Sequence, residues 1–507
     1  MAITQRKTKA IREYGDFQTP PALARAATEV LCRLGIRPRS ILEPTCGCGS
    51  FVAAASASFP DATAIIGVEI NHQHLNVAET VAAPYGCRVE LRHGDFFKLE
   101  WQSIVTKAGA PWLIVGNPPW VTSAELGAID SANLPEKSNF HGRTGIEAIT
   151  GKSNFDISEW MLLRYLDWLE GSSGTIAVLC KTAVARKILL HVWKKRLPVR
   201  RAQIYKIDAL NHFDAAVNAC FFVLEVEQKT NLVCCDVFDA LDVEAPSHTI
   251  GALDGHIISN MAAFNEYRGL FGSDNHYVWR SGVKHDCSKI MELTITRSGY
   301  QNGLGETVSL EDDILFPMLK SSDIGNGRVN CRGVMVVTQR FAGDDTNYIR
   351  TKAPLAWKYL TRHASLLQKR GSVIYKNKPP FSIFGVGPYS FAPWKVAISG
   401  LYKKLHFVKV GPVGGRPVLF DDTIYFLPCQ SEEEASFIEA LLTSEAAERF
   451  LLSMIHWDEK RPITAEILKR LSIQKLAATV GREREYSHFT GPERLPLFSV
   501  PVQRAMA

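Results

Sequence analysis

One short stretch says most about the fold: Trp112-Leu113-Ile114-Val115-Gly116-Asn117-Pro118-Pro119-Trp120. Its apolar part predicts a buried strand, and the two prolines predict a stiff loop at the strand's end, because proline fixes φ and has no N–H. The Asn117 side chain and the Pro118 carbonyl can accept hydrogen bonds beside the aromatic face of Trp120. Such groups suit a planar, amine-bearing ligand whose nitrogen is held toward an electrophile. Taken alone, the stretch fits a proline-rich turn after a core strand equally well.

The length and composition suggest two domains of an ordinary globular protein. A chain of 507 residues exceeds what one core usually supports. We place the domains at residues 1–245 and 255–507. Eleven cysteines occur without a Cys-x-x-Cys pair, so we expect no structural metal site and no disulfide framework. The first 14 residues resemble no signal peptide, and apolar runs such as 219–226 are too short to span a bilayer. We therefore expect a cytoplasmic protein that does not insert into a membrane.

Upstream lies a glycine turn that follows another apolar run. Residues 40–43 predict a strand, residues 44–49 (Pro-Thr-Cys-Gly-Cys-Gly) a tight turn, and residues 50–58 a helix. Glycines let a ligand approach the backbone, and a helix start offers unpaired N–H groups. The third glycine of the dinucleotide fingerprint and the Lys-Ser/Thr of a phosphate loop are both missing. A plain turn is the simplest interpretation of this segment alone.

Acidic residues end the next two predicted strands. Residues 64–69 end in Glu69, and residues 89–93 are followed by Asp95 and Phe96. Ligands of open α/β sheets bind at the carboxyl ends of the strands, and an acid at the second strand suits a ribose diol. Each acid alone could be a solvated cap. Four motifs at four successive strand ends, with helix-length spacers between them, predict a binding site.

The order of these motifs resembles that of class I S-adenosylmethionine-dependent methyltransferases. Within that class it resembles the N6-adenine DNA methyltransferases of gamma motif order, which include restriction-modification methylases. The resemblance implies a Rossmann-like α/β sheet with helices on both faces in residues 1–245. It implies a mixed α+β target-recognition domain in residues 255–507. A bacterial or archaeal protein is also implied.

The resemblance also implies roles for individual residues. S-adenosylmethionine would contact three groups: the N-terminal segment, the glycine loop and the later strand ends, which comprise Phe17, Thr19, Pro20, Glu43, Cys46, Gly47, Gly49, Glu69, Asp95, Phe96 and Asn117. The target base would meet Asn117, Pro118, Pro119 and Trp120, with Phe213 as a second aromatic wall. Trp120 stands where the family more often has Tyr or Phe. Phe213 could equally be a buried hairpin residue.

These groups favour methylation of an exocyclic amine. Two acceptors would bind both N–H bonds of adenine N6, and positioning next to a sulfonium would supply most of the rate. An adenine in a duplex must first be flipped out. Methylation of cytosine N4, of RNA adenine or of a protein glutamine stays open as an alternative, as does a catalytically silent DNA-binding subunit. The long polar segment 123–152 borders this site, and we predict a DNA-contacting flap.

The second half contains a basic stretch. Residues 346–420 hold thirteen Lys or Arg and no Asp or Glu, with aromatics interleaved. This composition predicts a polyanion-binding surface. We expect double-stranded DNA to contact Lys376, Lys378, Lys395, Lys403 and Lys404. The cluster His285-Asp286-Cys287 could suggest a metal, but we expect a structural role. Since no nuclease motif is evident, a cognate restriction endonuclease would be a separately encoded partner.

Overall fold

The computed structural model describes residues 17–121 and 156–491, and the structural statements below concern these residues. The predicted flap at 123–152 lies outside them. The chain divides into two compact units, Met1–Ala262 and Ala263–Ala507, which are described separately. The first unit ends later than the predicted residue 245, because two further strands extend its sheet as far as Ile258.

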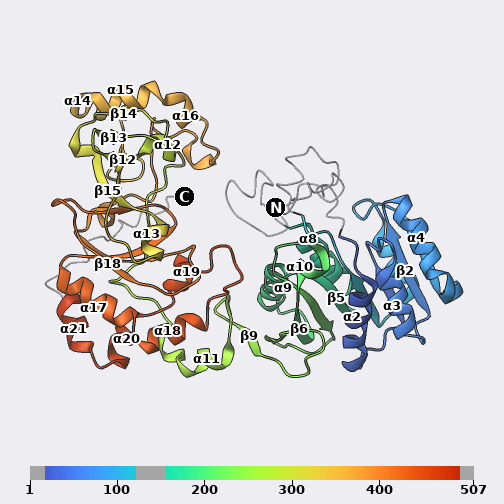
Figure 1. The fold of residues 1–507 in the computed structure, drawn as a ribbon. Coiled ribbons are helices and arrows are strands. Elements are labelled where there is room, and N and C mark those ends of the chain that lie inside the picture. Colours follow the sequence, from blue (N-terminus) through green and yellow to red (C-terminus); the bar gives the residue numbers. More distant parts are fainter. Residues whose placement is uncertain (1–16, 122–155, 492–507) are drawn as a thin grey trace, which may run out of the picture. The chain divides into compact units, whose positions relative to one another are not determined.

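The first unit is built on a ten-stranded sheet (Figure 1). Its strands are β1 (Ser40–Glu43), β2 (Ala64–Glu69), β3 (Val89–His93), β4 (Trp112–Gly116), β5 (Gly174–Lys181), β6 (Val199–Ile207), β7 (Ala219–Val226), β8 (Cys234–Phe238), β9 (His248–Leu253) and β10 (His256–Ile258). Their order is β10-β9-β8-β6-β7-β5-β4-β1-β2-β3. Strands β1 to β5 are parallel, whereas β7 lies antiparallel between β5 and β6.

Helices cover both faces of this sheet. They are α2 (Pro21–Arg33), α3 (Ser50–Ser58), α4 (His72–Ala82), η1 (Ala83–Arg88), α5 (Trp101–Ala108), α8 (Ile157–Trp168), α9 (Thr182–Lys195) and α10 (Ala209–Phe213). Successive strand residues point to opposite faces, so Ile41 joins the apolar core formed with α2 and α3, and Leu42 joins the core formed with α5, α8 and α9. The predicted Rossmann-like class is confirmed. The strand and helix limits predicted at 64–69, 112–116 and 50–58 are also those observed.

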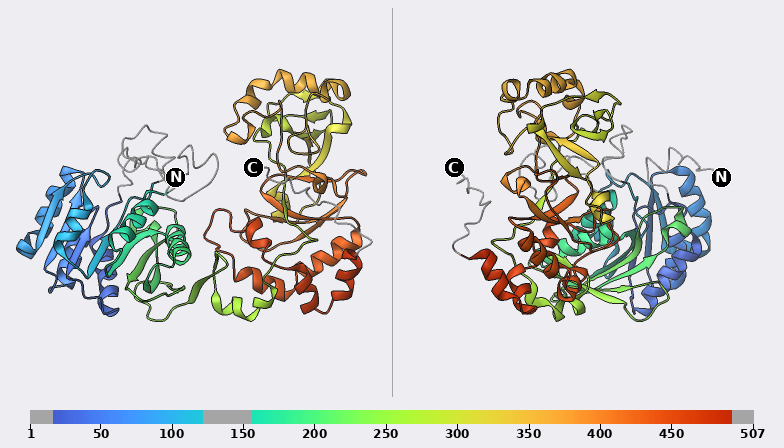
Figure 2. Two further views of the ribbon diagram at one scale, coloured as in Figure 1. Left: turned by 180° about the vertical axis from the view of Figure 1, so that it is seen from behind. Right: turned by 60° about the vertical axis from the view of Figure 1, so that its left-hand side comes forward.

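The second unit is a mixed α+β structure with two smaller sheets (Figure 2). One has the order β11-β20-β17-β18 and the other β14-β13-β12-β16-β15-β19. The strands are β11 (Arg280–Ser281), β12 (Glu292–Thr296), β13 (Gly299–Gln301), β14 (Thr307–Val308), β15 (Leu315–Leu319), β16 (Gly333–Val336), β17 (Trp394–Ser399), β18 (Val408–Val410), β19 (Leu419–Phe420) and β20 (Ile424–Cys429).

The helices of this unit are short and fall into two groups. Those of the first group are α11 (Met261–Glu266), η2 (Arg268–Leu270), α12 (Ser288–Met291), η3 (Asp312–Ile314), α13 (Ser321–Gly325), α14 (Ile349–Lys352), α15 (Pro354–Arg362), α16 (Ala364–Gln368), η4 (Val373–Tyr375) and η5 (Pro388–Phe391). The C-terminal group is α17 (Glu432–Leu442), α18 (Glu445–Leu452), α19 (Ala465–Leu468), α20 (Ile473–Thr479) and α21 (Glu483–Thr490). Helices α14 to α16 pack into one core with β12, β15 and β16. Within the described ranges, no helix has the length and apolar character needed to cross a membrane.

Candidate active site

The candidate site lies where the strand order of the first sheet reverses. The chain runs from β1 to β2 and β3 on one side, then returns to place β4 and β5 on the other. Loops that leave β1 and β4 therefore diverge, and ligands of such sheets bind in the crevice between them. A cavity of about 280 Å³ occupies this place.

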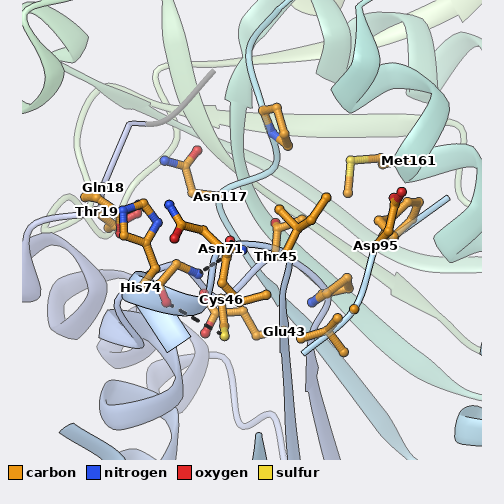
Figure 3. A pocket seen from close by; sticks show the side chains of 18 of the residues that line it. Gln18, Thr19, Glu43, Thr45, Cys46, Asn71, His74, Asp95, Asn117 and Met161 are labelled. Atoms are coloured by element: carbon orange, nitrogen blue, oxygen red, sulfur yellow. Dashed lines mark hydrogen bonds between the residues drawn. The ribbon is translucent and has the colours of Figure 1, made fainter. Parts of the chain in front are cut away.

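Figure 3 shows the side chains around the cavity. Asn117 and Gln18 lie at one end, and Asp95 and Met161 at the other. Nine of the eleven predicted cofactor residues line it, together with thirteen others: Phe17, Gln18, Thr19, Glu43, Pro44, Thr45, Cys46, Gly47, Ser50, Val68, Glu69, Ile70, Asn71, His74, Gly94, Asp95, Phe96, Phe97, Asn117, Pro119, Ile157 and Met161. Pro20 and Gly49 do not line the cavity.

The two glycines of the turn after β1 both have a left-handed backbone but lie against different residues. Gly47 has φ of 50°, and a Cβ there would lie 2.5 Å from Oε1 of Gln18. Gly49 has φ of 83° and starts α3, where a Cβ would lie 3.0 Å from Ala78 of α4. Both positions therefore favour glycine, because the backbone is left-handed and a neighbouring residue lies close. Pro20 also has a structural role, because its carbonyl accepts hydrogen bonds from the N–H groups of Leu23 and Ala24 at the start of α2.

Glu69 fastens the loops on both sides of the cavity. One carboxylate oxygen accepts the N–H of Gly47 at 2.9 Å, and the other accepts the N–H of Asn71 at 2.8 Å. The side chain is buried. A carboxylate offers about four lone-pair sites, so it can accept further hydroxyl donors while it holds both loops.

Glu43 presents a second carboxyl at the end of β1. It is 3% exposed, and its Oε2 has no hydrogen-bond partner among the described residues. Burial raises its pKa well above the ordinary value, while a backbone N–H at Val52 opposes the rise. A cation in the cavity would favour the charged form and supply the missing interaction.

Asn117 has one side of its amide fixed and the other open. Its Nδ2 donates to the carbonyl of Phe17 at 3.0 Å, which sets the orientation of the amide. Its Oδ1 is buried and has no hydrogen-bond partner within the described part of the chain. Buried acceptors are rarely left unpaired. The free oxygen therefore suits a donor from a bound ligand.

Three aromatic rings meet beside Asn117. The ring centroids of Trp120 and Phe213 are 5.1 Å apart, and Phe17 lies 5.8 Å from Trp120 and 6.1 Å from Phe213. The three come from the N-terminal segment, the β4 loop and α10. Phe213 thus lies next to Trp120, and its role as the second aromatic wall of a target-base site stays a prediction. Both rings are buried in the core, and neither lines the cavity.

At the other end of the cavity, Asp95 and Phe96 follow β3. Oδ1 of Asp95 accepts the N–H of Phe97 at 3.0 Å, which stabilises the turn. Phe96 is buried and packs edge-on against Trp160 of α8 at 6.0 Å. An apolar surface with one carboxylate beside it suits a purine ring with an amino group.

Two polar residues that stabilise the loops around this cavity were not predicted from the sequence. Oε1 of Gln18 accepts the N–H of Cys48 at 2.9 Å, and its Nε2 lies 3.3 Å from Nδ1 of His74. Asn71 caps α4 by accepting the N–H of Gln73 at 2.9 Å. Its place two residues after Glu69, directly before a helix, was a signal that could have indicated it.

The predicted DNA-binding lysines differ in exposure. Lys376, Lys378, Lys403 and Lys404 are exposed. Lys395 is 1% exposed on β17, and its Nζ donates to the carbonyl of Ala392 at 2.6 Å. Burial lowers its pKa to about 7. The prediction that Lys395 contacts DNA is therefore wrong for this structure, because the group lies in the core.

Further members of the basic stretch have partners from elsewhere in the chain. Lys409 pairs with Glu432 at 2.9 Å, and Arg362 pairs with Glu306 at 3.3 Å. No acid occurs within residues 346–420, but acids from elsewhere in the chain pair with some of its cations. His285 bonds the Cys287 N–H at 3.2 Å and pairs with Glu292 at 3.3 Å. Among the residues placed by the structure, no group of three or more His, Cys, Asp or Glu could hold a metal ion.

Known proteins share this chain's sequence pattern. A family profile described as N-6 DNA Methylase matches residues 3–187. The Type II methyltransferase M.NspV of Nostoc sp. is 44% identical over 476 residues, covering 94% of this chain and 98% of that protein. Among solved structures, that of the Type IIL restriction-modification enzyme MmeI in complex with DNA aligns with this chain at 12% identity and a TM-score of 0.48. The alignment covers 93% of this chain and 72% of the MmeI chain.

A second solved structure, the EcoKI M protein of a type I restriction enzyme, aligns over 44% of this chain and 48% of its own, at 12% identity and TM-score 0.31. Both structural likenesses are distant, so the assignment rests on the sequence relative and the family profile. The chain belongs to the N-6 DNA methylase family: it is a class I S-adenosylmethionine-dependent DNA adenine methyltransferase of the restriction-modification kind, with the gamma order of motifs.

Proposed function

We propose that this chain binds S-adenosylmethionine in the cavity at β1 to β4 and methylates N6 of an adenine flipped out of double-stranded DNA. The observation that carries this proposal is the amide of Asn117. Its oxygen is buried and unpaired among the described residues, its nitrogen is fixed by the Phe17 carbonyl, and the side chain lines the cavity.

The residues of the cavity fit the proposed cofactor along its length. Glu69 would accept the ribose hydroxyls, with Asp95 and Phe96 at the adenine end. Gly47, Gln18 and Thr19 would surround the amino-acid end. Oε2 of Glu43, which has no partner among the described residues, belongs to a side chain that also lines the cavity and would stabilise a positive charge. When bound, the cofactor supplies an electrophilic methyl group on a sulfonium.

Asn117 would act on the target amine. Its Oδ1 and the carbonyl of Pro118 would accept the two N–H bonds of adenine N6, which favours a tetrahedral nitrogen whose lone pair points at the methyl group. Because the amide is already oriented by Phe17, no reorganisation is needed during transfer. The proton that leaves N6 needs no strong base, since the methylated ammonium is acidic and passes it to water.

The flipped base would stack between Trp120 and Phe213. Their centroids are 5.1 Å apart, which is less than the roughly 7 Å that a ring sandwiched between two others needs. Trp120 is fixed, because its indole N–H donates to the Leu179 carbonyl at 3.3 Å. Insertion of the base would therefore displace Phe213 on the short helix α10 rather than Trp120.

The second unit would bind the duplex around the target. Four exposed lysines, Lys376, Lys378, Lys403 and Lys404, would contact phosphates. Base contacts from this unit would define the recognition sequence. A separately encoded restriction endonuclease would recognise the same site, and the chain itself would not cut DNA in the presence of Mg²⁺.

One experiment tests the proposal directly. The protein is incubated with unmethylated genomic DNA and tritiated S-adenosylmethionine, and the labelled nucleoside is identified by mass spectrometry. We expect N6-methyladenine. Label in N4-methylcytosine, in RNA or in protein would replace the adenine assignment with the corresponding alternative, and no labelled product with any substrate would contradict methyl transfer altogether.

A further inference from the structure

The carboxyl end of β5 holds the catalytic loop from two sides. The carbonyl of Leu179 accepts the indole N–H of Trp120 at 3.3 Å. Two residues later, Nζ of Lys181 donates to the backbone carbonyl of Trp120 at 2.9 Å. One strand end thus fixes both the ring and the main chain of the residue that closes the Asn-Pro-Pro-Trp loop.

The ammonium of Lys181 is oriented by an acid on another element. Its Nζ lies 2.6 Å from Oδ2 of Asp156, whose side chain is 7% exposed. The other oxygen of Asp156 accepts the Ser158 N–H at 3.1 Å and so caps α8. The Lys181 side chain is 23% exposed. Charge-assisted bonds with this little access to water are stronger than surface ion pairs.

The loop between Asn117 and Trp120 transmits this restraint. It contains two prolines, so few of its torsions are free. Its first residue is bonded to Phe17, and Val121 at its end accepts the N–H of Ile157 at 2.9 Å. A shift of the Trp120 carbonyl would therefore move Asn117 as well, since a stiff loop cannot absorb it.

We propose that Lys181 is a positioning residue for methyl transfer: held by Asp156, it clamps the Trp120 carbonyl and so places Asn117 and Trp120 for the target base. This inference rests on the proposed role of Asn117. Lys181 itself does not touch the reacting atoms. Its loss should therefore lower the rate of transfer while leaving the cofactor's cavity intact.

A neighbouring ion pair provides a matched control. Nζ of Lys187 on α9 lies 2.6 Å from Oε2 of Glu159 on α8, and Glu159 is 4% exposed. This pair has the same N···O distance as Lys181 and Asp156 and involves the same helix. Among the described residues, Lys187 bonds to Glu159 and not to the catalytic loop, and it lies outside the cavity lining. The Lys187 side chain is 53% exposed, against 23% for Lys181, so its loss should cost somewhat less stability. Only the loss of Lys181 should affect catalysis.

The test compares Lys181→Met with Lys187→Met in the full chain. Single-turnover methylation is measured with saturating S-adenosylmethionine and duplex DNA, beside the cofactor dissociation constant and the melting temperature. We expect Lys181→Met to slow transfer about 10- to 100-fold, the scale of a small misplacement of a catalytic group. The cofactor dissociation constant should change by less than about threefold, and Lys187→Met should transfer within about twofold of the unmodified protein.

Two further variants keep the test decisive if Lys181→Met folds poorly. Lys181→Arg should recover most of the rate, because a guanidinium can reach both oxygens. Asp156→Asn keeps the helix cap but weakens the pair, so it should slow transfer by an intermediate factor. In the double variant Lys181→Met with Asp156→Asn, the rate should be no lower than in Lys181→Met alone, since both act through one restraint.

The outcomes separate this inference from the function on which it rests. Equal single-turnover rates for Lys181→Met, Lys187→Met and the unmodified protein would overturn the positioning role. If Asn117→Ala is inactive in the same assay, only the role of Lys181 is then lost. If Asn117→Ala transfers methyl groups normally, the proposed function itself fails.

Discussion

The two units of this chain use charged residues in opposite ways. In the first, Glu43, Glu69 and Asp95 are far apart in sequence but line one cavity, because each ends a neighbouring strand of one parallel sheet. In the second, five lysines within 29 residues were expected on one surface, yet Lys395 is buried while the other four are exposed. The place of a charged residue at a strand end thus predicts which residues lie together in the fold better than the number of charges in a stretch of sequence does.

The largest effect should come from the amide at the centre of the first unit. Asn117→Ala removes the oriented acceptor, and we expect methyl transfer to fall at least about 10³-fold, as for loss of a preorganised donor or acceptor in other enzymes. Cofactor affinity, measured by calorimetry, should stay within a few fold. Activity above a few per cent would show that Asn117 is dispensable and that its place in the cavity has another reason.

A smaller effect is expected for the exposed lysines of the second unit. Changing Lys376, Lys378, Lys403 and Lys404 to Gln should weaken duplex binding about 100-fold at physiological salt. If all four contact phosphates, the slope of log K against log salt should become less steep by about 3 to 4.

Lys395→Met is the matched control for that set, because it removes one more lysine from the same stretch. The buried position of Lys395 implies that the salt slope of this variant should equal that of the unmodified protein. An unchanged slope for the fourfold variant would move the DNA surface elsewhere. A reduced slope for Lys395→Met would instead show that this lysine becomes exposed on binding.

A substitution at Glu69 tests how the two loops beside the cavity of the first unit contribute to cofactor binding. Glu69→Gln can accept only one of the two backbone N–H groups, at Gly47 and Asn71, so one loop loses its restraint. We expect cofactor affinity to fall about 10-fold with little change in the rate at saturating cofactor. The exposed Glu79 on α4 offers a control, since Glu79→Gln should change neither quantity. A fall in the saturated rate equal to that in affinity would assign Glu69 to the transfer step.

The last prediction concerns the stability of the second unit rather than catalysis or binding. The unfolded chain protonates Lys395 below its ordinary pKa of 10.5, whereas the folded chain keeps it neutral down to about pH 7. Stability is therefore highest above pH 10.5, falls as the pH drops toward 7 by at most about 1.4 kcal/mol per pH unit, and then levels off. In Lys395→Met this dependence should vanish. Urea midpoints at pH 7.5 and 9.5 measure it, with the exposed Lys404→Met as control, and identical pH dependence in all three proteins would contradict a neutral Lys395.

Much of the first unit could be predicted because the short-range sequence pattern and the packing of the sheet favour the same strands. Three apolar runs of four to six residues, two ending in Glu43 and Glu69 and the third just before Asn117, are buried on both faces, as parallel strands are. The contributions of Gln18 and His74 could not be predicted, since each acts through a contact between segments 56 residues apart. Pairing at that separation depends on how helices pack, which periodicity does not reveal.

The error at Lys395 has a local cause that the sequence did contain. Lys395 belongs to Trp394-Lys-Val-Ala-Ile-Ser399, an apolar run that forms a strand with five successive buried residues. Because both faces of this strand are covered, its lysine is buried together with the apolar residues. The pairing of Lys409 with Glu432 and of Arg362 with Glu306 was not evident, because both acids lie outside residues 346–420.

The segment from Phe17 to Thr19 has a consequence for the timing of turnover. It borders the cofactor cavity, bonds the glycine loop through Gln18, and orients Asn117 through the Phe17 carbonyl. Any movement of this segment that lets spent cofactor leave would also release the amide proposed to bind the target base. Cofactor exchange and base capture would then exclude one another, so each methylation event would require the enzyme to let go of the extruded nucleotide before it reloads.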